Sequence, residues 1–469
     1  MSQKTNRGQW GSRFGFIMAA AGSAVGLGNI WRFPYLAGEN GGSAFVLIYL
    51  FFVIVMGISL MTTEFALGRR AGVSAVGSFK NLDRRWTFVG VIGVLTAFII
   101  MGFYPVVGGW SLAYMFKSIT GLMSTPDTAA FFRNFVSSSM EPLLWMLIYM
   151  ILNIVIVVRG VSGGIEAASK VLMPVLIVLL IFVAVYGMTL DGSFAGVEFL
   201  IKPDFSAVTW DSVLSALGQA FFSMSLGMGA MLTYGSYLKK DQSLPGNAGL
   251  VSGLDTFVAL LAGFAIFPAL FAFGVEPTSG AGLVFMVVPQ VFSNISGIGA
   301  ILSFFFFTAL TVAALTSSVS LLEVVTSYLI DEHGINRKKA TLAVAVAMTI
   351  LSTLASLSQG VLSDVSILGA SFFDAFDIVT DKIFLAVGGV LIAIFAGWVV
   401  KKEDLISEVT NEGTKPFALV NVWYAIVKYA IPLVVGVVAV MGIINIQQRA
   451  LMIAGLAIIA ILAVFSKKL

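Results

Sequence analysis

The chain carries MAAAGSAVGLGNIWRFP at residues 18–34 and GQAFFSMSLGMGAMLTYGSY at residues 218–237, two apolar stretches with glycines near their middles. Each glycine in a helix interior costs up to about 1 kcal/mol relative to alanine, so both stretches favour a local break. A break at mid-bilayer frees backbone groups that lipid cannot satisfy, so it must line a cavity in the protein. Close packing through small residues is the alternative for either stretch alone, but a pair of interruptions points to a transporter binding site.

Composition indicates a membrane protein. Of the 469 residues, 58% are hydrophobic and 11% are charged, and the mean hydropathy is +0.99. A soluble domain averages about 25% charged residues. This chain therefore has too few polar side chains to cover a surface in water, and lipid removes that need. We expect an all-α integral membrane protein.

About twelve segments reach the roughly 20 apolar residues that a transmembrane helix needs. They lie near residues 15–37, 42–67, 88–116, 143–158, 171–189, 213–237, 250–275, 298–330, 340–357, 372–400, 422–444 and 450–465. The last segment is short and could lie in the interface, so eleven spans are the alternative. The polar connections are too short for a soluble domain, and we expect a single transmembrane domain over residues 1–469.

Basic residues fall mainly on one side of this predicted bundle. With the N-terminus inside, the inner side receives twenty Lys and Arg, whereas the outer side receives four, namely Lys117, Arg133, Lys202 and Arg449. This excess predicts a multi-pass protein of the cell (inner, cytoplasmic) membrane with a cytoplasmic N-terminus. The net charge of +3 and the lack of a clustered basic face argue against a nucleic-acid partner.

The two interrupted stretches are the first and sixth predicted spans. Their separation by five spans predicts two five-span repeats, at about residues 10–190 and 205–400, each with one broken helix. Extra C-terminal helices follow at about residues 418–466.

Three motifs resemble the neurotransmitter:sodium symporter family. They are residues 22–34 followed by Glu39-Asn-Gly-Gly42, residues 218–229 followed by Tyr234-Gly-Ser-Tyr237, and Ala314-Leu-Thr-Ser-Ser318. The resemblance covers nearly the whole chain and is greatest to the small bacterial amino-acid transporters. It implies a leucine-transporter-like fold, in which the two repeats are inverted and helices 1 and 6 are broken.

The resemblance also implies two sodium sites. The ligands of the first would be Ala24, Asn29, Ser223 and Asp255, together with the substrate carboxylate. The ligands of the second would be Gly22, Val25, Ala313, Thr316 and Ser317. Such oxygen ligands with little formal charge suit sodium, because divalent ions usually demand more carboxylates. For the hydroxyls of the eighth span, the alternative is bonding back to their own helix.

Asp255 departs from the pattern of chloride-dependent relatives, which carry neutral residues in this part of the seventh span. A built-in carboxylate removes the need for an anion, so we expect chloride-independent transport. An ionisable residue inside a span is costly and usually functional. The alternatives are a structural role within the bundle and uptake of a proton during the cycle.

An amino-acid substrate at the midplane is implied by the same resemblance. Its carboxylate would meet the amides of the first break, and the rest of the pocket would be apolar, which favours aliphatic to aromatic amino acids. No acidic residue occupies the break, where the monoamine transporters of this family carry Asp. The substrate-binding residues would be Ser23, Ala24, Gly26, Gly28, Ile100, Tyr104, Phe222, Ser223, Ser225, Met228, Ser318 and Leu321. Ordinary bundle packing is the alternative for the apolar ones.

The outer gate of the family is matched by Arg32, which directly follows the first break and needs a partner at this depth. Asp377 in the tenth span would be that partner, with Asp374 nearby. Phe222 would cap the substrate beneath them.

The inner gate is matched by Arg7 and Trp10, which would form a latch with Asp331, braced by Tyr237. Solvated interface charges are the alternative for Arg7 and Asp331. Glu64 in the second span would support the unwound backbone of the sixth.

Together these features predict a sodium-coupled symporter that imports hydrophobic L-amino acids by alternating access, with two sodium ions and no organic cofactor. An enzyme is not expected, because the chain has no Cys, its one His, His333, falls in a predicted loop, and it lacks the H-E-x-x-H and G-x-S-x-G motifs. An amino-acid-binding sensor and a channel-like protein are the alternatives. A monomer would suffice; the sequence leaves the oligomeric state, the preferred amino acid and the sodium stoichiometry open.

Overall fold

The computed structural model describes residues 8–275 and 282–469, and within these ranges the chain forms helices and no β-strand. Ten helical segments in the described ranges are long and apolar enough to cross a membrane. They are Ser43–Ala71, Arg84–Thr120, Glu141–Val158, Val161–Met188, Leu244–Ala272, Gly299–His333, Arg337–Leu357, Phe372–Val399, Val420–Ile444 and Arg449–Lys468. The all-α membrane fold expected from composition is therefore confirmed.

The two remaining segments are broken helices. Helix α1 (Arg13–Ala24) is followed by the segment Gly28–Glu39, which bends away from it by 51° and consists of the π-helical turn η1 (Gly28–Arg32) and α2 (Phe33–Glu39). Helix α11 (Trp210–Ser223) is separated from α12 (Ala230–Gly235) by six residues. The predicted breaks in the first and sixth spans are confirmed. By length and apolar character the described residues hold ten continuous spans, or eleven when the bent pair Arg13–Ala24 and Gly28–Glu39 is counted as one.

Several continuous spans contain π-helical turns. The elements of the spans are α3 (Ser43–Phe52), η2 (Val53–Gly57), α4 (Ile58–Ala71), α6 (Thr87–Thr120), α8 (Glu141–Val158), η5 (Val161–Glu166), α9 (Ala167–Met188), α13 (Leu244–Ala272), α15 (Gly299–His333), α16 (Arg337–Leu357), α17 (Phe372–Ile378), η8 (Val379–Leu385), α18 (Ala386–Ile394), η9 (Phe395–Val399), α20 (Val420–Ala425), η10 (Ile426–Ala430), α21 (Ile431–Ile444) and α22 (Arg449–Phe465). The connecting helices are α5 (Ala75–Leu82), α7 (Thr128–Ser137), α10 (Phe194–Ile201), α14 (Val288–Ser293) and α19 (Lys402–Val409).

Polar side chains define where the broken spans begin. Ser12 caps α1, since its hydroxyl accepts a hydrogen bond from the amide of Gly15 at 3.0 Å. Thr209 and Ser212 form a capping box at the start of α11. Such caps satisfy amides that a helix leaves without partners at its first turn. The first half of each broken helix therefore starts at a position fixed by its sequence.

Continuous helices surround the breaks. Helix α15 packs against α1, α6, α8, α9 and α16, while α13 packs against α1, η1, α4 and α9. Helix α12 lies between α4 and α15. The residues of both breaks are buried, so the interrupted backbone faces protein and not lipid.

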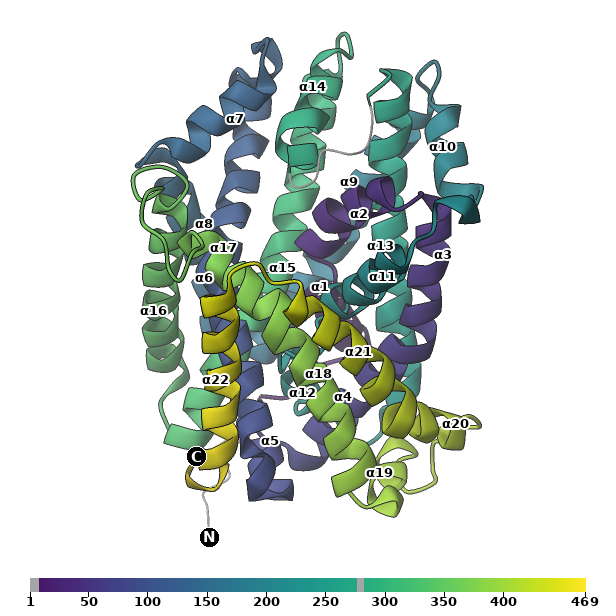
Figure 1. The fold of residues 1–469 in the computed structure, drawn as a ribbon, viewed down its shortest axis with the longest axis vertical. Helices are drawn as coiled ribbons and strands as arrows, with labels where there is room; N and C mark the ends of the chain where they lie inside the picture. Colours follow the sequence, from purple (N-terminus) through teal and green to yellow (C-terminus); the bar gives the residue numbers. More distant parts are fainter. Residues whose placement is uncertain (1–7, 276–281) are drawn as a thin grey trace.

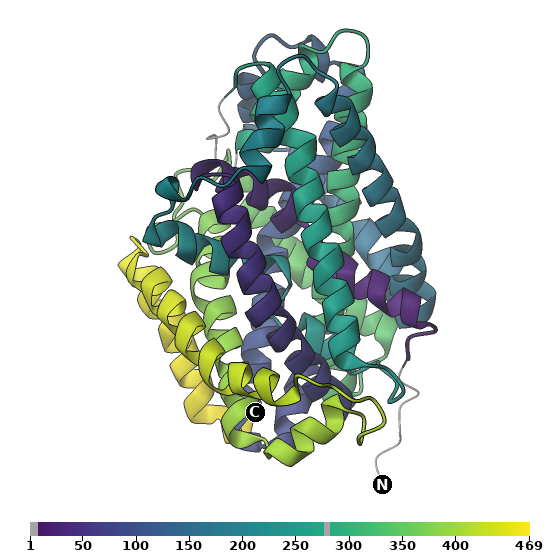
Figure 2. The ribbon, with the colours of Figure 1, turned by 90° about the vertical axis from the view of Figure 1, so that its right-hand side faces the viewer.

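The two ends of the bundle carry different connections. Helices α5, α19 and α20 and the C-terminus lie at one end of the molecule, and α7, α10 and α14 lie at the other (Figure 1). Figure 2 shows α21 and α22, in yellow, on the outside of the bundle. These two are peripheral, since only 22% and 17% of the apolar windows of their spans are buried, against 78% for Arg84–Thr120.

Candidate functional site

The first break begins where α1 ends at Ala24. Val25 takes an extended conformation (ψ 104°), and regular helical structure returns with the π-helical turn at Gly28. Side chains replace the helix partners that the break removes. The amide of Gly26 donates to Asn29 Oδ1 at 3.0 Å, and the amide of Leu27 donates to the hydroxyl of Tyr104 at 3.1 Å.

The second break lies between Ser223 and Ala230, where the backbone turns through positive φ at Ser225 (53°), Gly227 (81°) and Gly229 (77°). Such angles favour glycine because they bring a side chain against the backbone. The amide of Gly227 donates to Glu64 Oε1 at 2.8 Å. The prediction that Glu64 supports this unwound backbone is confirmed.

Three polar side chains form a cluster between the two breaks and α13. Asn29 Nδ2 donates to Asp255 Oδ1 at 2.7 Å and to Ser223 Oγ at 3.0 Å. Ser223 Oγ in turn donates to Asp255, with its two carboxylate oxygens at 2.8 and 2.9 Å. The structure therefore brings together Asn29, Ser223 and Asp255, three residues predicted for the first sodium site. The fourth, Ala24, lines the cavity next to them.

Tyr49 of α3 also belongs to this cluster and was not predicted. Its hydroxyl donates to Asp255 Oδ2 at 3.3 Å, and its side chain is fully buried. No local motif marks it, because it lies within an ordinary apolar run of the second span. The cluster combines amide, hydroxyl and carboxylate oxygens around one formal charge, which is a suitable environment for a hard monovalent cation.

A second group of oxygens lies where α1 meets α15. The hydroxyl of Ser317 donates to the carbonyl of Ser23 at 2.6 Å and lies 3.4 and 3.5 Å from the carbonyl oxygens of Val25 and Gly22. The carbonyl of Ser23 also accepts from the hydroxyl of Ser225 at 2.8 Å. One carbonyl of α1 is thereby tied to both the second break and α15.

Thr316 lies on the same side of α15. A Cβ built on Gly22 would come within 3.0 Å of the Thr316 Cβ, which shows how closely the two helices approach. The hydroxyl of Thr316 lies 3.0 Å from the carbonyl of Ala313, so it bonds back to its own helix, the alternative raised from the sequence. Its oxygen still offers lone pairs to a cation. The five residues predicted for the second sodium site are therefore adjacent.

A small cavity of about 20 Å³ lies between the two groups of oxygens. Its lining consists of Ala24, Gly26, Gly28, Ile100, Tyr104, Phe222, Ser225, Met228, Ser317 and Leu321. Nine of these ten are predicted substrate-binding residues, and the tenth, Ser317, was predicted only as a sodium ligand. Ser23 and Ser223 contribute to the two oxygen groups beside the cavity.

Ser318 was predicted to line the pocket, and this prediction is wrong. Its hydroxyl donates to Asn153 Oδ1 at 2.6 Å and is 2.8 Å from the hydroxyl of Tyr149, so it faces α8. Consecutive residues of a helix are turned by about 100° from each other. Ser317 therefore faces the cavity while its neighbour faces α8.

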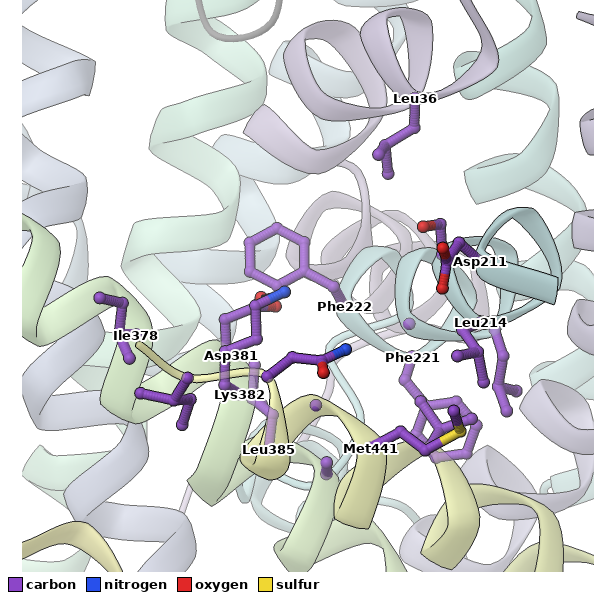
Figure 3. A pocket seen from close by; sticks show the side chains of 18 of the residues that line it. Leu36, Asp211, Leu214, Phe221, Phe222, Ile378, Asp381, Lys382, Leu385 and Met441 are labelled. Carbon is purple, nitrogen blue, oxygen red and sulfur yellow. Dashed lines mark ion pairs between the residues drawn. The ribbon is translucent and has the colours of Figure 1, made fainter. Parts of the chain in front are cut away.

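A larger cavity of about 600 Å³ lies on the other side of Phe222, whose ring contributes to both cavities. Figure 3 shows Asp381 and Lys382 on one side of it and Asp211 and Leu214 of α11 on the other. The guanidinium of Arg32 lies 4.7 Å from the centre of the Phe222 ring. Phe222 thus separates the small cavity from the larger one, as expected for a cap.

The partner of Arg32 is Asp381, which corrects the prediction of Asp377. Arg32 Nη1 lies 2.7 Å from Asp381 Oδ1, and Nη2 donates to Oδ2 at 3.2 Å. Asp381 lies one helical turn further along the chain than Asp377, inside η8. Among the described residues Asp377 forms no ion pair, and Asp374 is exposed and accepts from the hydroxyl of Ser371.

Trp10 contacts the C-terminal end of α12. Its indole donates to the carbonyl of Tyr234 at 3.0 Å, and its ring packs edge-on against Tyr237. Of the predicted latch, Arg7 lies outside the described residues, and Asp331 is half-buried near the end of α15.

The hydroxyl of Tyr237, the residue expected to brace the latch, donates to Glu323 Oε1 at 2.7 Å. Glu323 is fully buried and pairs with Arg337 at 2.7 Å, so this ion pair joins α15, α16 and the end of α12. Neither residue was predicted. A buried acid in the eighth span and a basic residue opening the ninth are the only signals that the sequence offers for this pair.

Comparison with known proteins gives consistent matches over the chain. The model of the sodium:neurotransmitter symporter family matches residues 7–138 and 136–454. An uncharacterized sodium-dependent transporter of Bacillus subtilis, YhdH, is 39% identical over 435 residues, which cover 92% of this chain and 96% of the relative. Another from Haemophilus influenzae is 37% identical over 448 residues, covering 92% and 97%.

A solved structure is also similar. The crystal structure of MhsT in complex with L-phenylalanine has a TM-score of 0.85 and 45% sequence identity, and the match covers 93% of this chain and 100% of MhsT.

The second break generates a prediction on stability. Gly227→Ala would place a methyl group at a φ of 81°, 2.6 Å from the carbonyl oxygen of Leu385. We expect a loss of at least about 2 kcal/mol of stability, because the left-handed conformation and the collision both oppose a side chain. Thermal unfolding of the purified protein in detergent measures it. Gly249→Ala in α13 is the control, since its methyl group meets nothing within 4 Å; equal melting temperatures of the two variants would contradict the prediction.

Proposed function

This chain belongs to the sodium:neurotransmitter symporter family, and we propose that it imports hydrophobic L-amino acids, from aliphatic to aromatic, by sodium-coupled symport without a requirement for chloride. As a member of this family it is a transporter and not an enzyme. The observation that carries the proposal is the convergence of two backbone breaks, two groups of oxygens and one apolar cavity at a single place.

The amino acid would bind with its carboxylate against the first break. Amides at a half-helix start carry partial positive charge, and the hydroxyl of Tyr104 is already held beside Gly26 by the amide of Leu27. No carboxylate side chain lies in the break to repel the substrate. The ammonium would meet carbonyls near Ala24 and Ser225.

The side chain of the substrate would lie among Ile100, Phe222, Met228 and Leu321. These residues are apolar, and methionine repacks readily around different shapes. The similar transporter MhsT was crystallised with L-phenylalanine, which supports the aromatic end of the proposed range. Because pockets for such ligands usually exceed about 300 Å³, a cavity of about 20 Å³ must widen on binding. Movement of Phe222 would join it to the larger cavity.

Two sodium ions would accompany the substrate. One would bind at Asn29, Ser223 and Asp255 with the substrate carboxylate, so that each ligand stabilises the other. The second would bind between the end of α1 and α15. We infer that Asp255 supplies the negative charge within the site. The N-terminus would be cytoplasmic, and a monomer would suffice.

Asp255→Asn tests the coupling. The variant keeps the shape of the side chain but removes its charge, so we expect at least a tenfold higher sodium concentration for half-maximal uptake, or about 1.4 kcal/mol. The measurement is uptake of labelled leucine and phenylalanine into proteoliposomes under a sodium gradient. Asp364→Asn, in an exposed connection, is the matched control. An unchanged sodium dependence would refute the assignment. Binding without accumulation would identify a sensor, and flux without sodium stoichiometry a channel.

Replacing external chloride with gluconate at constant sodium should leave the initial uptake rate within about 20% of its value, because the negative charge is part of the protein. The same proteoliposomes with potassium in place of sodium provide the control for zero coupled uptake. A steep fall in rate without chloride would show that Asp255 does not perform this role.

Gly26→Ala tests the placement of the substrate. A methyl group there would come within 2.5 Å of both the Ser317 hydroxyl and the Tyr104 hydroxyl, at the position proposed for the carboxylate. We expect amino-acid binding to weaken at least a hundredfold, measured by thermal shift with twenty amino acids in sodium. Gly249→Ala should bind normally. Retained affinity in Gly26→Ala would place the carboxylate elsewhere.

A further inference from the structure

Lys428 is a cation inside a span that has no acidic partner among the described residues. It lies eight residues after the first residue of the span Val420–Ile444, which places it about 12 Å along the helix axis. At comparable positions in other spans, Lys170 pairs with Glu166, and Arg32 and Lys382 both pair with Asp381. An ionisable group at such a position is costly and is usually functional.

Three aromatic rings surround the ammonium of Lys428. Its Nζ lies 4.6 Å from the ring centre of Trp398, 5.6 Å from that of Tyr429 and 5.7 Å from that of Tyr424. Ring quadrupoles attract a cation but leave its formal charge uncompensated.

The geometry of this cage is fixed by the backbone. The indole of Trp398 donates to the carbonyl of Lys428 at 2.9 Å, and the hydroxyl of Tyr424 donates to the carbonyl of Gly397 at 2.9 Å. A Cβ on Gly397 would lie 2.7 Å from the Lys428 Cα, so η9 and η10 are in close contact. The rings and the lysine are therefore preorganised.

A second cation lies beside the first. Lys402 Nζ is 5.2 Å from the ring centre of Tyr424, and Lys402 is exposed at the start of α19. Glu403 and Glu412 line the same surface groove as Lys402. In Figure 1, α18 and α21 run beside each other towards α19 and α20, at the end of the bundle where these lysines lie.

Two of the rings lie on the surface of the bundle, since Trp398 is 60% exposed and Tyr429 is 58% exposed. Trp398 is the second-last residue of the span Phe372–Val399, and its bond to the carbonyl of Lys428 brings Lys428 and Tyr429 to the level of that span end. Basic pockets between spans on the cytoplasmic side suit anionic lipid headgroups, and aromatic residues occupy the headgroup level. We propose that Lys428 and Lys402 bind the phosphate of an anionic phospholipid, with Trp398 and Tyr429 against its glycerol and upper acyl chain. This lipid site is independent of the transport mechanism.

Native mass spectrometry of the full chain in detergent tests the proposal, with dioleoyl phosphatidylglycerol and dioleoyl phosphatidylcholine as probes. We expect wild-type protein to bind the anionic lipid at least fivefold more tightly than the zwitterionic one. The double variant Lys402→Gln/Lys428→Gln should lose this preference, and Lys428→Arg should keep it. Lys468→Gln is the matched control, because Lys468 also stacks on a ring, that of Phe465, at 5.4 Å. That control should bind like wild type.

Three results would overturn the proposal. Equal binding of the two lipids by the wild-type protein would mean that Lys428 does not bind the phosphate of an anionic lipid. Unchanged phosphatidylglycerol binding in the double variant would place the lipid elsewhere. Displacement of the lipid by an equal concentration of inorganic phosphate or glycerol phosphate would identify a site for a free anion. If the double variant is not monodisperse, the single variant Lys428→Gln is measured instead, and we expect its affinity for phosphatidylglycerol to fall about threefold.

Discussion

A peptide group at the middle of a bilayer must find its hydrogen-bond partner within the protein, because lipid offers none. The rest of this structure depends on that constraint. Two helices are interrupted at mid-depth, and continuous spans enclose both interruptions. The uneven burial of the spans follows from this arrangement. The spans Arg84–Thr120 and Gly299–His333 are 78% and 72% buried over their apolar windows, whereas the last two spans are 22% and 17% buried and remain at the periphery.

Side chains replace the lost helix partners, two of them from distant parts of the chain. Glu64 accepts from Gly227, Asn29 Oδ1 from Gly26, and Gln219 Nε2 donates to the carbonyl of Gly28 at 2.8 Å. Each of these hydrogen bonds lets the backbone stay unwound without an unsatisfied polar group in the interior. The backbone groups beside the cavity that have no such side-chain partner are the ones proposed to bind the substrate and the ions.

The sequence could predict the features that depend on local signals. Hydrophobic length located the spans, glycines located the breaks, and the motifs brought Asn29, Ser223 and Asp255 into one hypothesis. The sequence could not show which way a side chain faces around its helix, or at which turn of a helix a partner lies. Ser317 and Ser318 differ by one residue, yet they face different helices. Asp377 and Asp381 are one turn apart in a span that contains a π-helical turn, so only coordinates decide which of them reaches Arg32.

The carbonyl of Ser23 has both of its lone pairs engaged, by the hydroxyls of Ser317 and Ser225. An oxygen that already accepts two hydrogen bonds is a poor ligand for a cation. We therefore expect neighbouring carbonyls, and not that of Ser23, to coordinate an ion at this end of α1. The Ser23 carbonyl links the two repeats through these hydrogen bonds. The carbonyl oxygens of Gly22, Ala24 and Val25 on either side can still coordinate a cation. An ion at the proposed site would then leave without breaking the hydrogen bonds of Ser23, so the packing of the two repeats would not depend on whether that site is occupied.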